Sequence, residues 1–477
     1  MTVGNAKIAR SFVWKLLEKG SLQVVAFLVT LVLARILSPQ EYGIVSLVLV
    51  FTSIAIVFVQ GGFNTALIQR KGATQEDFST VLFLSLIISM VLYALLFAIA
   101  PLIATLYNED SLVGVTRVIS LMLIFGAFNS VQVAYATKKF MFKSLFVSNF
   151  SAVIVSAVIG IGLALNEYGV WALVAQQLGN QAFACIVMWF TVRWRPAKTF
   201  SLQSVKDLFA FGGNVLAGNL LVSLFLNVRS LLIGVIADTA TLGLFNRGRQ
   251  FPTAIMEAIN GSLQEVMLPA FSDMQDDVEE VRNTVRRSIK ISTFIVFPLM
   301  LGLAAIAEPL VNLLLTEKWL ACVPFLQVFC ISYLFNPTQT ISAQALRGIG
   351  NSSSTLKLEV ARKIAEAILL LVSVPFGAMA LAVSSVVAGL VGCLATVLAN
   401  AKWLGYKGVD QLKDVMFPLM AGFVMACCMY AIGFFIEESW LAVVVECLTG
   451  ITVYLCLAVV LKSEAIRDLL RFVPGLR

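Results

Sequence analysis

The chain has 477 residues, of which 59% are hydrophobic and 13% are charged, with a net charge of +7 and a mean hydropathy of +0.92. Ordinary soluble domains are about 45–50% apolar and about 25% charged. This composition excludes a soluble globular enzyme, a disordered chain and a disulfide-stapled scaffold. We therefore expect an all-α polytopic membrane protein, and we assign its basic charge to membrane orientation rather than to a nucleic-acid partner.

The residue types that usually carry catalysis are sparse. Histidine is absent, which removes the commonest general base, metal ligand and pH switch. The eight cysteines lie within apolar runs, without metal-site spacing, where Cys behaves as a small hydrophobe. The chain also lacks a GxxxxGK[ST] phosphate-binding loop. We expect no enzyme, no catalytic residue, no metal site and no cofactor.

Apolar runs predict about 14 transmembrane helices, each long enough to cross a hydrocarbon core about 30 Å thick. The runs are 12–37, 42–63, 79–106, 113–136, 146–165, 168–192, 208–236, 241–268, 290–315, 320–346, 356–375, 377–401, 415–436 and 439–461. The first run is too long for a signal-peptide core, so we expect a retained helix. The longest polar stretch, 271–290, predicts a charged amphipathic helix at the membrane surface that leads into the ninth span.

The connections between these spans are charged asymmetrically. With a cytoplasmic N-terminus, the cytoplasmic connections hold 28 of the 34 Lys and Arg residues. The opposite connections hold Arg35 and Lys318, with acidic residues such as Glu109 and Asp238. Because Lys and Arg favour the cytoplasmic side of a membrane, we expect both termini in the cytoplasm.

An internal repeat is visible at an offset of about 200 residues. ARILSPQEYG (34–43) aligns with GVIADTATLG (234–243), and AIAPLIATL (98–106) aligns with AIAEPLVNLLL (305–315) after one insertion. We expect two six-helix lobes related by a pseudo-two-fold axis along the membrane normal, as in transporters with parallel repeats. The expected domains are 1–200 (helices 1–6), 201–405 (helices 7–12), and 406–477 (helices 13–14 and a cytoplasmic tail).

Basic residues inside spans mark candidate functional positions, because each costs about 2.5–3.5 kcal/mol at mid-bilayer on insertion scales. Arg229 in the seventh span, Arg247 and Arg249 in the eighth, and Lys19 in the first predict a cationic cavity between the lobes. A guanidinium group binds phosphate oxygens through a planar, always-charged fork. Such a cavity would suit a phosphate or pyrophosphate head group.

Three further residues complete this hypothesis. Glu18 and Glu257 are candidate coupling residues or charge partners of the basic side chains. Pro252 lies inside the eighth span, where the missing N–H weakens the helix, and it is a candidate hinge.

A structural interpretation of the same charges stays open. Arg117 would reach the outer interface by snorkelling, and Asp238 could pair with one of the two arginines of the eighth span. Lys15, Glu18 and Lys19 could form a charge cluster along one helix face. Glu308 and Glu446 are expected to cap their spans near the outer interface. Arg229 is the hardest of these residues to explain in structural terms.

Four segments carry the pattern of a known family. They are LVLARILSPQEYG (31–43), GLFNRGRQFP (243–252), LPAFSDMQDD (268–277) and FPLMLGLAAIAEPLVNLLLTEKW (297–319). With the span count, they resemble the Wzx-type polysaccharide transporters of the multidrug/oligosaccharidyl-lipid/polysaccharide flippase superfamily. The resemblance covers helices 1–12 and is strongest to the exopolysaccharide branch of colanic or teichuronic acid type.

The resemblance implies a flippase of the bacterial inner membrane. Its cargo would be an undecaprenyl-pyrophosphate-linked oligosaccharide for exopolysaccharide or lipopolysaccharide, moved to the periplasmic leaflet by alternating access of the two lobes. Polysaccharide polymerase and export proteins are candidate partners, and helices 13 and 14 would help form a groove for the lipid tail. The second span departs from related flippases because it contains no basic residue, so the cationic lining would depend mainly on helices 7 and 8.

Other functions remain as alternatives. A multidrug or other lipid-carrier exporter of the same superfamily is the first, although cationic drugs need an acidic cavity. A membrane-embedded glycosyltransferase or polymerase would need acid–base residues, usually on a sizeable loop, and a scaffold would need no intramembrane arginines. Loss of surface polysaccharide in a deletion strain, with accumulation of the lipid-linked unit, would favour the flippase.

Overall fold

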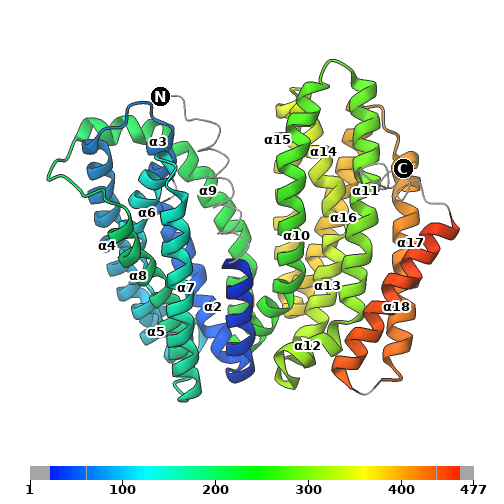
Figure 1. Cartoon of the computed structure of the whole chain (residues 1–477), viewed down its shortest axis with the longest axis horizontal. Helices are drawn as coiled ribbons and strands as arrows, with labels where there is room; N and C mark the ends of the chain where they lie inside the picture. The colour runs from blue at the N-terminus through cyan, green and yellow to red at the C-terminus, as the bar shows by residue number, and fades with distance from the viewer. Residues whose placement is uncertain (1–21, 61, 437, 462–477) are drawn as a thin grey trace. The chain divides into compact units, whose positions relative to one another are not determined.

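The computed structural model describes residues 22–60, 62–436 and 438–461, and every regular element within them is helical (Figure 1). In this part of the chain, 11 helical segments are long and apolar enough to cross a membrane. The expected all-α polytopic membrane fold is therefore confirmed. Contacts divide the chain into two compact units, Met1–Gly243 and Leu244–Arg477, which we describe separately.

The first unit begins, in its described part, with a helix over Leu22–Ile36. The following helices are α2 (Pro39–Gln60), α3 (Phe63–Gln69), α4 (Gln75–Tyr107), α5 (Ser111–Ile119), α6 (Met122–Lys138), α7 (Phe142–Leu165), α8 (Val170–Thr191) and α9 (Leu202–Ile236). Helix α7 packs along α8, α4 packs against α5 and α6, and α9 lies against α2 and α3.

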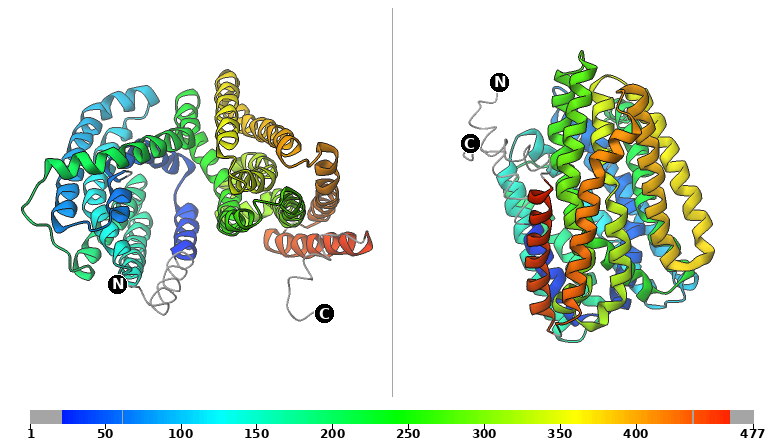
Figure 2. Two further views of the ribbon diagram at one scale, coloured as in Figure 1. Left: turned by 90° about the horizontal axis from the view of Figure 1, so that it is seen from above. Right: turned by 90° about the vertical axis from the view of Figure 1, so that its right-hand side faces the viewer.

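The second unit contains most of α10 (Thr239–Asp273), whose first five residues belong to the first unit. It continues with α11 (Val278–Ala305), α12 (Ala307–Leu315), η1 (Glu317–Cys322), α13 (Val323–Tyr333), α14 (Asn336–Gly348), α15 (Ser352–Ser373), η2 (Val374–Phe376), α16 (Gly377–Trp403), α17 (Gly408–Gly433) and α18 (Ser439–Val460). Helix α17 packs on α11, and α18 packs along α17; Figure 2 shows α17 and α18 in orange and red.

Several expected spans are broken into shorter helices. The run 113–136 is α5 followed by α6, and the run 320–346 is η1, α13 and α14. Pro337, expected inside a span, lies in the first turn of α14, where a missing N–H is harmless. Helix α10 is absent from the 11 candidate spans. The count of 14 spans stays a prediction.

The charged helix expected over 271–290 does lead into the ninth span, but it begins at Val278, and its location at the membrane surface stays a prediction. Helix α10 continues to Asp273, and α11 begins at Val278 and runs without a break to Ala305. Asp277 caps α11, because its Oδ1 accepts hydrogen bonds from the backbone N–H groups of Glu279 (2.9 Å) and Glu280 (3.0 Å). The charged segment is therefore the first turns of a spanning helix.

Two glycines bring the starts of α2 and α10 into backbone contact. A Cβ atom on Gly43 would lie 1.6 Å from the carbonyl oxygen of Thr239, and one on Gly243 would lie 2.0 Å from that of Pro39. Pro39 and Thr239, like Gly43 and Gly243, are equivalent in the repeat at an offset of 200. The contact is therefore reciprocal, as at a two-fold axis, and it involves only residues of the first unit.

Asp238 starts α10 beside this contact. Its Oδ1 accepts a hydrogen bond from the backbone N–H of Thr241 at 2.7 Å. The hydrogen bonds to Thr241 hold the pKa of the Asp238 carboxyl below its ordinary value. Asp238 thus acts as an ionised helix cap at the positive end of the α10 dipole.

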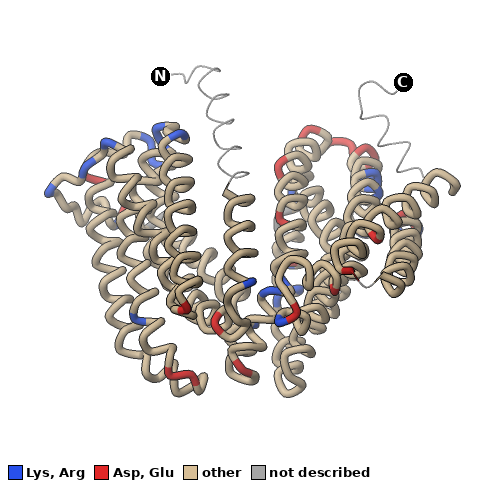
Figure 3. Tube along the Cα trace, turned by 60° about the horizontal axis from the view of Figure 1, so that its bottom comes forward, with Lys and Arg blue, Asp and Glu red and all other residues tan. Residues whose placement is uncertain are grey.

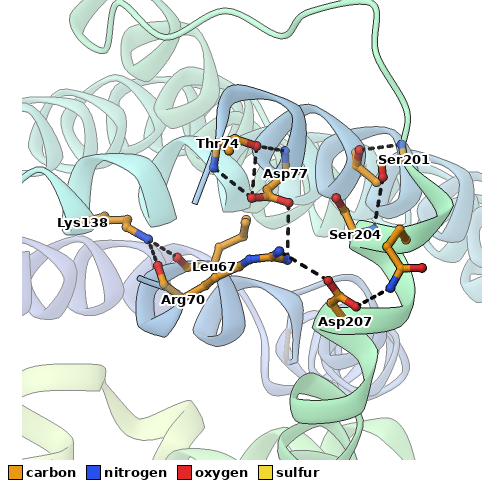
Figure 4. Close-up of polar contacts among 10 residues, drawn as sticks. Leu67, Arg70, Thr74, Asp77, Lys138, Ser201, Ser204 and Asp207 are labelled. Carbon is orange, nitrogen blue, oxygen red and sulfur yellow. Dashed lines mark hydrogen bonds and ion pairs between the residues drawn. The ribbon is translucent and has the colours of Figure 1, made fainter. Parts of the chain in front are cut away.

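Basic connections of the first unit meet at one end (Figures 3 and 4). The Nζ of Lys138 donates hydrogen bonds to the carbonyl oxygens of Leu67 (2.7 Å) and Arg70 (2.5 Å), which joins the α6–α7 and α3–α4 connections. Arg70 forms ion pairs with Asp77 (3.5 Å) and Asp207 (3.4 Å). These basic connections thus lie at one end of the first unit, as expected if the connections alternate between the two sides of the membrane. Which side of the membrane this end faces in the cell stays a prediction.

The opposite end of the first unit is more acidic. Gln40, at the start of α2, donates a hydrogen bond to Glu109 in the α4–α5 connection at 3.0 Å. Figure 3 shows Asp and Glu residues at this end of the unit. The two ends of the first unit therefore differ in charge, as the loop composition predicts.

A buried carboxylate ties α17 to α11 in the second unit. Asp414, whose side chain is 4% exposed, accepts hydrogen bonds from Arg286 Nε (2.5 Å), Arg286 Nη2 (3.0 Å) and the Tyr406 hydroxyl (2.6 Å), and pairs with Lys290 (3.1 Å). Burial, with the hydrogen bond to Asp414, raises the pKa of Tyr406 above its ordinary value. This cluster anchors the first of the two helices that lie beyond the repeat.

We expect the reciprocal glycine contact to be sensitive to a single methyl group. Gly43→Ala and Gly243→Ala should each lower the free energy of unfolding by roughly 1–3 kcal/mol, the usual cost of overpacking. The matched control is Gly162→Ala in α7, where a Cβ has no neighbour within 4 Å and should be neutral or stabilising. Thermal unfolding of the purified protein in detergent would measure this, and equal stability of all three variants would contradict the contact.

We also expect the Asp414 cluster to matter more than a surface ion pair. Asp414→Asn should lower the free energy of unfolding by about 2 kcal/mol. This loss is smaller than that for a fully buried ion pair, because the Arg286 side chain is 43% exposed and solvent screens its charge. Glu279→Gln, which removes an exposed pair with Arg282 (2.6 Å), should change it by less than about 1 kcal/mol. The same unfolding assay compares the two variants, and a larger effect at Glu279 would refute this ranking.

Candidate functional site

Two of the predicted site residues, Lys19 and Glu18, lie outside the described residues. The same is true of Lys15, the third member of the alternative charge cluster. Their predicted roles at one end of the cavity stay predictions. The described candidates are the three arginines, Glu257 and Pro252.

Arg229 lies on α9 between two anchor points of the first unit. Asn227 donates a hydrogen bond to Ser53 of α2 at 3.2 Å, and the Tyr107 hydroxyl of α4 donates one to the carbonyl oxygen of Leu231 at 3.4 Å. Gly234 allows α9 to approach Tyr107 closely. Arg229 is half-buried, and the packing on either side fixes its position along the helix.

Arg247 is held inside the second unit. It is 4% exposed, and its Cζ lies 5.0 Å from the centre of the ring of Trp319, which is fully buried. Its Nη1 donates a hydrogen bond to the Oε1 of Gln250 at 2.7 Å. Stacking over an aromatic face stabilises a desolvated guanidinium, so Arg247 has well-defined partners within the protein.

Arg249 is placed differently, although it is only two residues away. It is half-buried, and no carboxylate of the described residues forms an ion pair with it. Its carbonyl oxygen accepts a hydrogen bond from the Thr253 hydroxyl (2.7 Å), which also contacts the Tyr333 hydroxyl of α13 (2.8 Å). The helix around Arg249 is therefore fixed, while its guanidinium remains available for an anionic ligand.

Helix α10 continues beyond Arg249 with one apolar and one polar face. Its buried side includes Phe245, Met256 and Phe271. Its exposed side carries the polar residues Gln250, Glu257, Ser262, Gln264 and Glu265 over four turns, followed by the apolar residues Val266 and Leu268. Charged side chains at membrane depth face protein or water rather than lipid. This polar face of α10 is the strongest indication of a hydrated or ligand-binding surface.

Pro252 is buried in α10, and the helix continues through it to Asp273. One turn earlier, Gly248 allows α10 to approach η1 and α13, because a Cβ there would lie 2.8 Å from the carbonyl oxygen of Cys322. Proline at 252 removes the N–H that the carbonyl group of Gly248 would accept. A hinge at Pro252 stays a prediction.

Arg117 has a structural partner. It lies in the last turn of α5, and its Cζ is 4.2 Å from the centre of the Phe97 ring. Its Nε also donates a long hydrogen bond of 3.5 Å to the carbonyl oxygen of Phe97. The structural interpretation therefore accounts for Arg117.

Sequence reasoning missed a charged row on α15. Arg362 and Lys363 lie inside this helix, as the predicted run 356–375 requires, but their partners were not predicted. Arg362 donates hydrogen bonds to Gln339 of α14 (2.7 Å) and to Glu359 (2.6 Å), and Lys363 pairs with Glu366 (2.9 Å). The spacing of three residues within each pair is a helical signal that could have identified them.

The expected cap at Glu446 is wrong, while Glu308 does lie in the first turn of α12. Helix α18 begins at Ser439, so Glu446 is two turns inside it and is 3% exposed. The predicted run 439–461 starts where α18 starts and already places Glu446 inside the span, so the cap was inconsistent with the predicted helix. A buried carboxyl group at this position needs a separate explanation.

Comparison with known proteins places this architecture in a family. A family model described as "Polysaccharide biosynthesis protein" matches residues 32–324. The teichuronic acid biosynthesis protein TuaB of Bacillus subtilis (strain 168) is 29% identical over 61% of this chain and 61% of its own length. The succinoglycan biosynthesis transport protein ExoT of Rhizobium meliloti (strain 1021) is 23% identical over 98% of this chain and 96% of its own.

A solved structure supports the fold independently of sequence. The lipid II flippase MurJ, in an inward closed conformation, superposes with a TM-score of 0.73 at 14% identity, over 96% of this chain and 99% of MurJ. At this identity the likeness establishes the fold alone. Because the family model covers more than half of the sequence, the chain belongs to the polysaccharide biosynthesis protein family, in agreement with the resemblance of its four segments.

Proposed function

We propose that this protein is a flippase that moves an undecaprenyl-pyrophosphate-linked oligosaccharide across the bacterial inner membrane for surface polysaccharide synthesis. The observations that carry the proposal are the half-buried Arg249 of α10, which has no ion-pair partner among the described residues, and the exposed polar residues that follow it on the same helix. A long helix among apolar spans keeps such a face only where it meets water or a polar cargo. A guanidinium without an ion-pair partner suits a pyrophosphate group.

The relatives support the same cargo class. TuaB and ExoT are named for the synthesis or transport of polysaccharides, and MurJ is named as a flippase of lipid II. A multidrug exporter would need an acidic lining for cationic drugs; the polar face carries Glu257 and Glu265, so the preference for an anionic cargo depends on Arg249, next to this face, and on Arg229 of α9. A transferase or polymerase would need general acid–base groups.

Each candidate residue receives a role in this proposal. Arg249 and Arg229 bind the pyrophosphate, while Arg247, stacked on Trp319 and bonded to Gln250, positions the polar face. Glu257 is a charge partner or coupling residue, and Lys19 with Glu18 extends the cationic cavity between the lobes. Alternating access of lobes 1–200 and 201–405, a hinge at Pro252, and partnership with a polymerase or export proteins complete the proposal.

We expect Arg249→Ala and Arg229→Ala to reduce polysaccharide export more than about tenfold, because each removes charge-assisted hydrogen bonds worth roughly 1.5–3 kcal/mol. Lys at either position should restore export only in part, since it keeps the charge but loses the planar fork. Surface polysaccharide would be measured in a deletion strain that carries each variant. Mass spectrometry of lipid-linked intermediates would identify the accumulated cargo.

Arg117→Ala is the matched control for the loss of a membrane arginine, because its partner is Phe97 of the same unit. It should leave export within about twofold of the unaltered protein at equal protein level. Full export by both Arg249→Ala and Arg229→Ala would refute the cationic site. A deletion strain with normal surface polysaccharide would refute the function itself.

The proposed orientation has its own test. An epitope tag inserted after Gly72, at the basic end of the first unit, should be cytoplasmic because Lys and Arg favour that side. A tag after Glu167, in the α7–α8 connection, should be outside. Antibody should reach the second tag in intact spheroplasts and the first only after lysis. The reverse pattern would overturn the orientation and, with it, the proposed direction of transport.

A further inference from the structure

A cavity of about 310 Å³ lies at the end of the second unit where α17 ends and α18 begins. Helix α12 and η1 complete its wall. Its polar and aromatic lining consists of Glu308, Asn312, Tyr430, Phe434, Ser439 and Glu446. None of these residues belongs to the site proposed for the pyrophosphate.

Glu446 is the central group of this cavity. It is 3% exposed, and its Oε2 accepts no hydrogen bond from the described residues. A Cβ on Gly433 would lie 2.1 Å from the Oε1 of Glu446, so only glycine leaves room for the carboxyl group. The side chain leans toward the N-terminus of α18, as helical side chains do, and it therefore reaches the last turn of α17.

The electrostatics of the cavity are negative throughout. Glu446 and the exposed Glu308 are the charged residues of its lining, which contains neither Lys nor Arg. Gly433 is the last residue of α17, and a helix C-terminus adds a partial negative charge. A buried carboxylate is costly unless a positive group pairs with it. A cavity lined in this way favours a cationic ligand over phosphate.

The size and lining of the cavity suit an organic cation better than a bare metal ion. The volume far exceeds one ion, and the described residues contain no cluster of three His, Cys, Asp or Glu side chains suited to a metal. Tyr430 and Phe434 add exposed aromatic rings, which attract organic cations. Asn312 donates its amide to Ser439 at 2.9 Å, which leaves its carbonyl oxygen as an acceptor.

We propose that this cavity binds a primary ammonium group, supplied by an ethanolamine phospholipid head group or by a free amine. The three N–H donors of an ammonium group match the carboxylates of Glu446 and Glu308 and the carbonyl oxygen of Asn312. The aromatic rings cover the adjacent carbon atoms. This binding site is independent of polysaccharide transport and would exist whatever cargo the arginines bind.

Native mass spectrometry and calorimetry of the full-length protein would test the site with two probes. The first is ethanolamine added to lipid-free protein in detergent, and the second is phosphatidylethanolamine in nanodiscs, compared with phosphatidylglycerol, which lacks an amine. Binding of both ethanolamine and the ethanolamine lipid would identify the ammonium group as the ligand, and binding of the lipid alone would identify the head group. We expect Glu446→Gln to weaken binding about tenfold or more.

Controls separate this role from folding. Glu308→Gln alters an exposed residue and should weaken binding without changing thermal stability. Glu317→Gln, nearby in η1 but outside the lining, should change neither property. Equal binding of phosphatidylglycerol and phosphatidylethanolamine, preference for a neutral sugar such as glucose, or amine binding unchanged in both lining variants would overturn the proposal.

Discussion

The reciprocal backbone contact of Gly43 and Gly243 is the constraint on which the joining of α2 and the start of α10 depends. Hydrophobic attraction does not hold helices together in lipid, so small residues that allow close backbone approach take its place. Here the Pro39 and Thr239 carbonyl oxygens occupy the space that each Cβ would need. The contact fixes the first residues of α10, Thr239–Gly243, against the start of α2 within the first unit.

The arginines of this membrane protein differ in whether neighbouring residues provide partners for their guanidinium groups. Arg117 stacks on Phe97, and Arg247 stacks on Trp319 and bonds to Gln250. Arg249 has no carboxylate partner in the described part of the chain, although it shares a helix with Arg247. This difference, rather than the number of basic residues, directs the functional proposal to the polar face of α10.

Sequence reasoning predicted the helices well and their ends poorly. Hydropathy reports that a run of side chains tolerates lipid, and it identified every long helix, including the polar α10. It does not report where a helix stops, so the break between α5 and α6 and the cap at Asp277 were missed. Glu446 was expected to cap its span although the predicted run 439–461 places it two turns inside, and the pairing of Arg362 was not predicted because its partner Gln339 lies on another helix.

The two helices beyond the repeat are integral to the second unit, not appended to it. At one end Asp414 ties α17 to α11, and farther along the Tyr454 hydroxyl of α18 donates a 2.8 Å hydrogen bond to the carbonyl oxygen of Phe294. Near the other end Asn312 joins α12 to α18. These attachments hold the end of α17 beside Glu446, so an acidic cavity arises in the same unit that carries Arg249. The two proposed sites would therefore have opposite charge, and opposite charge would let each discriminate against the ligand of the other.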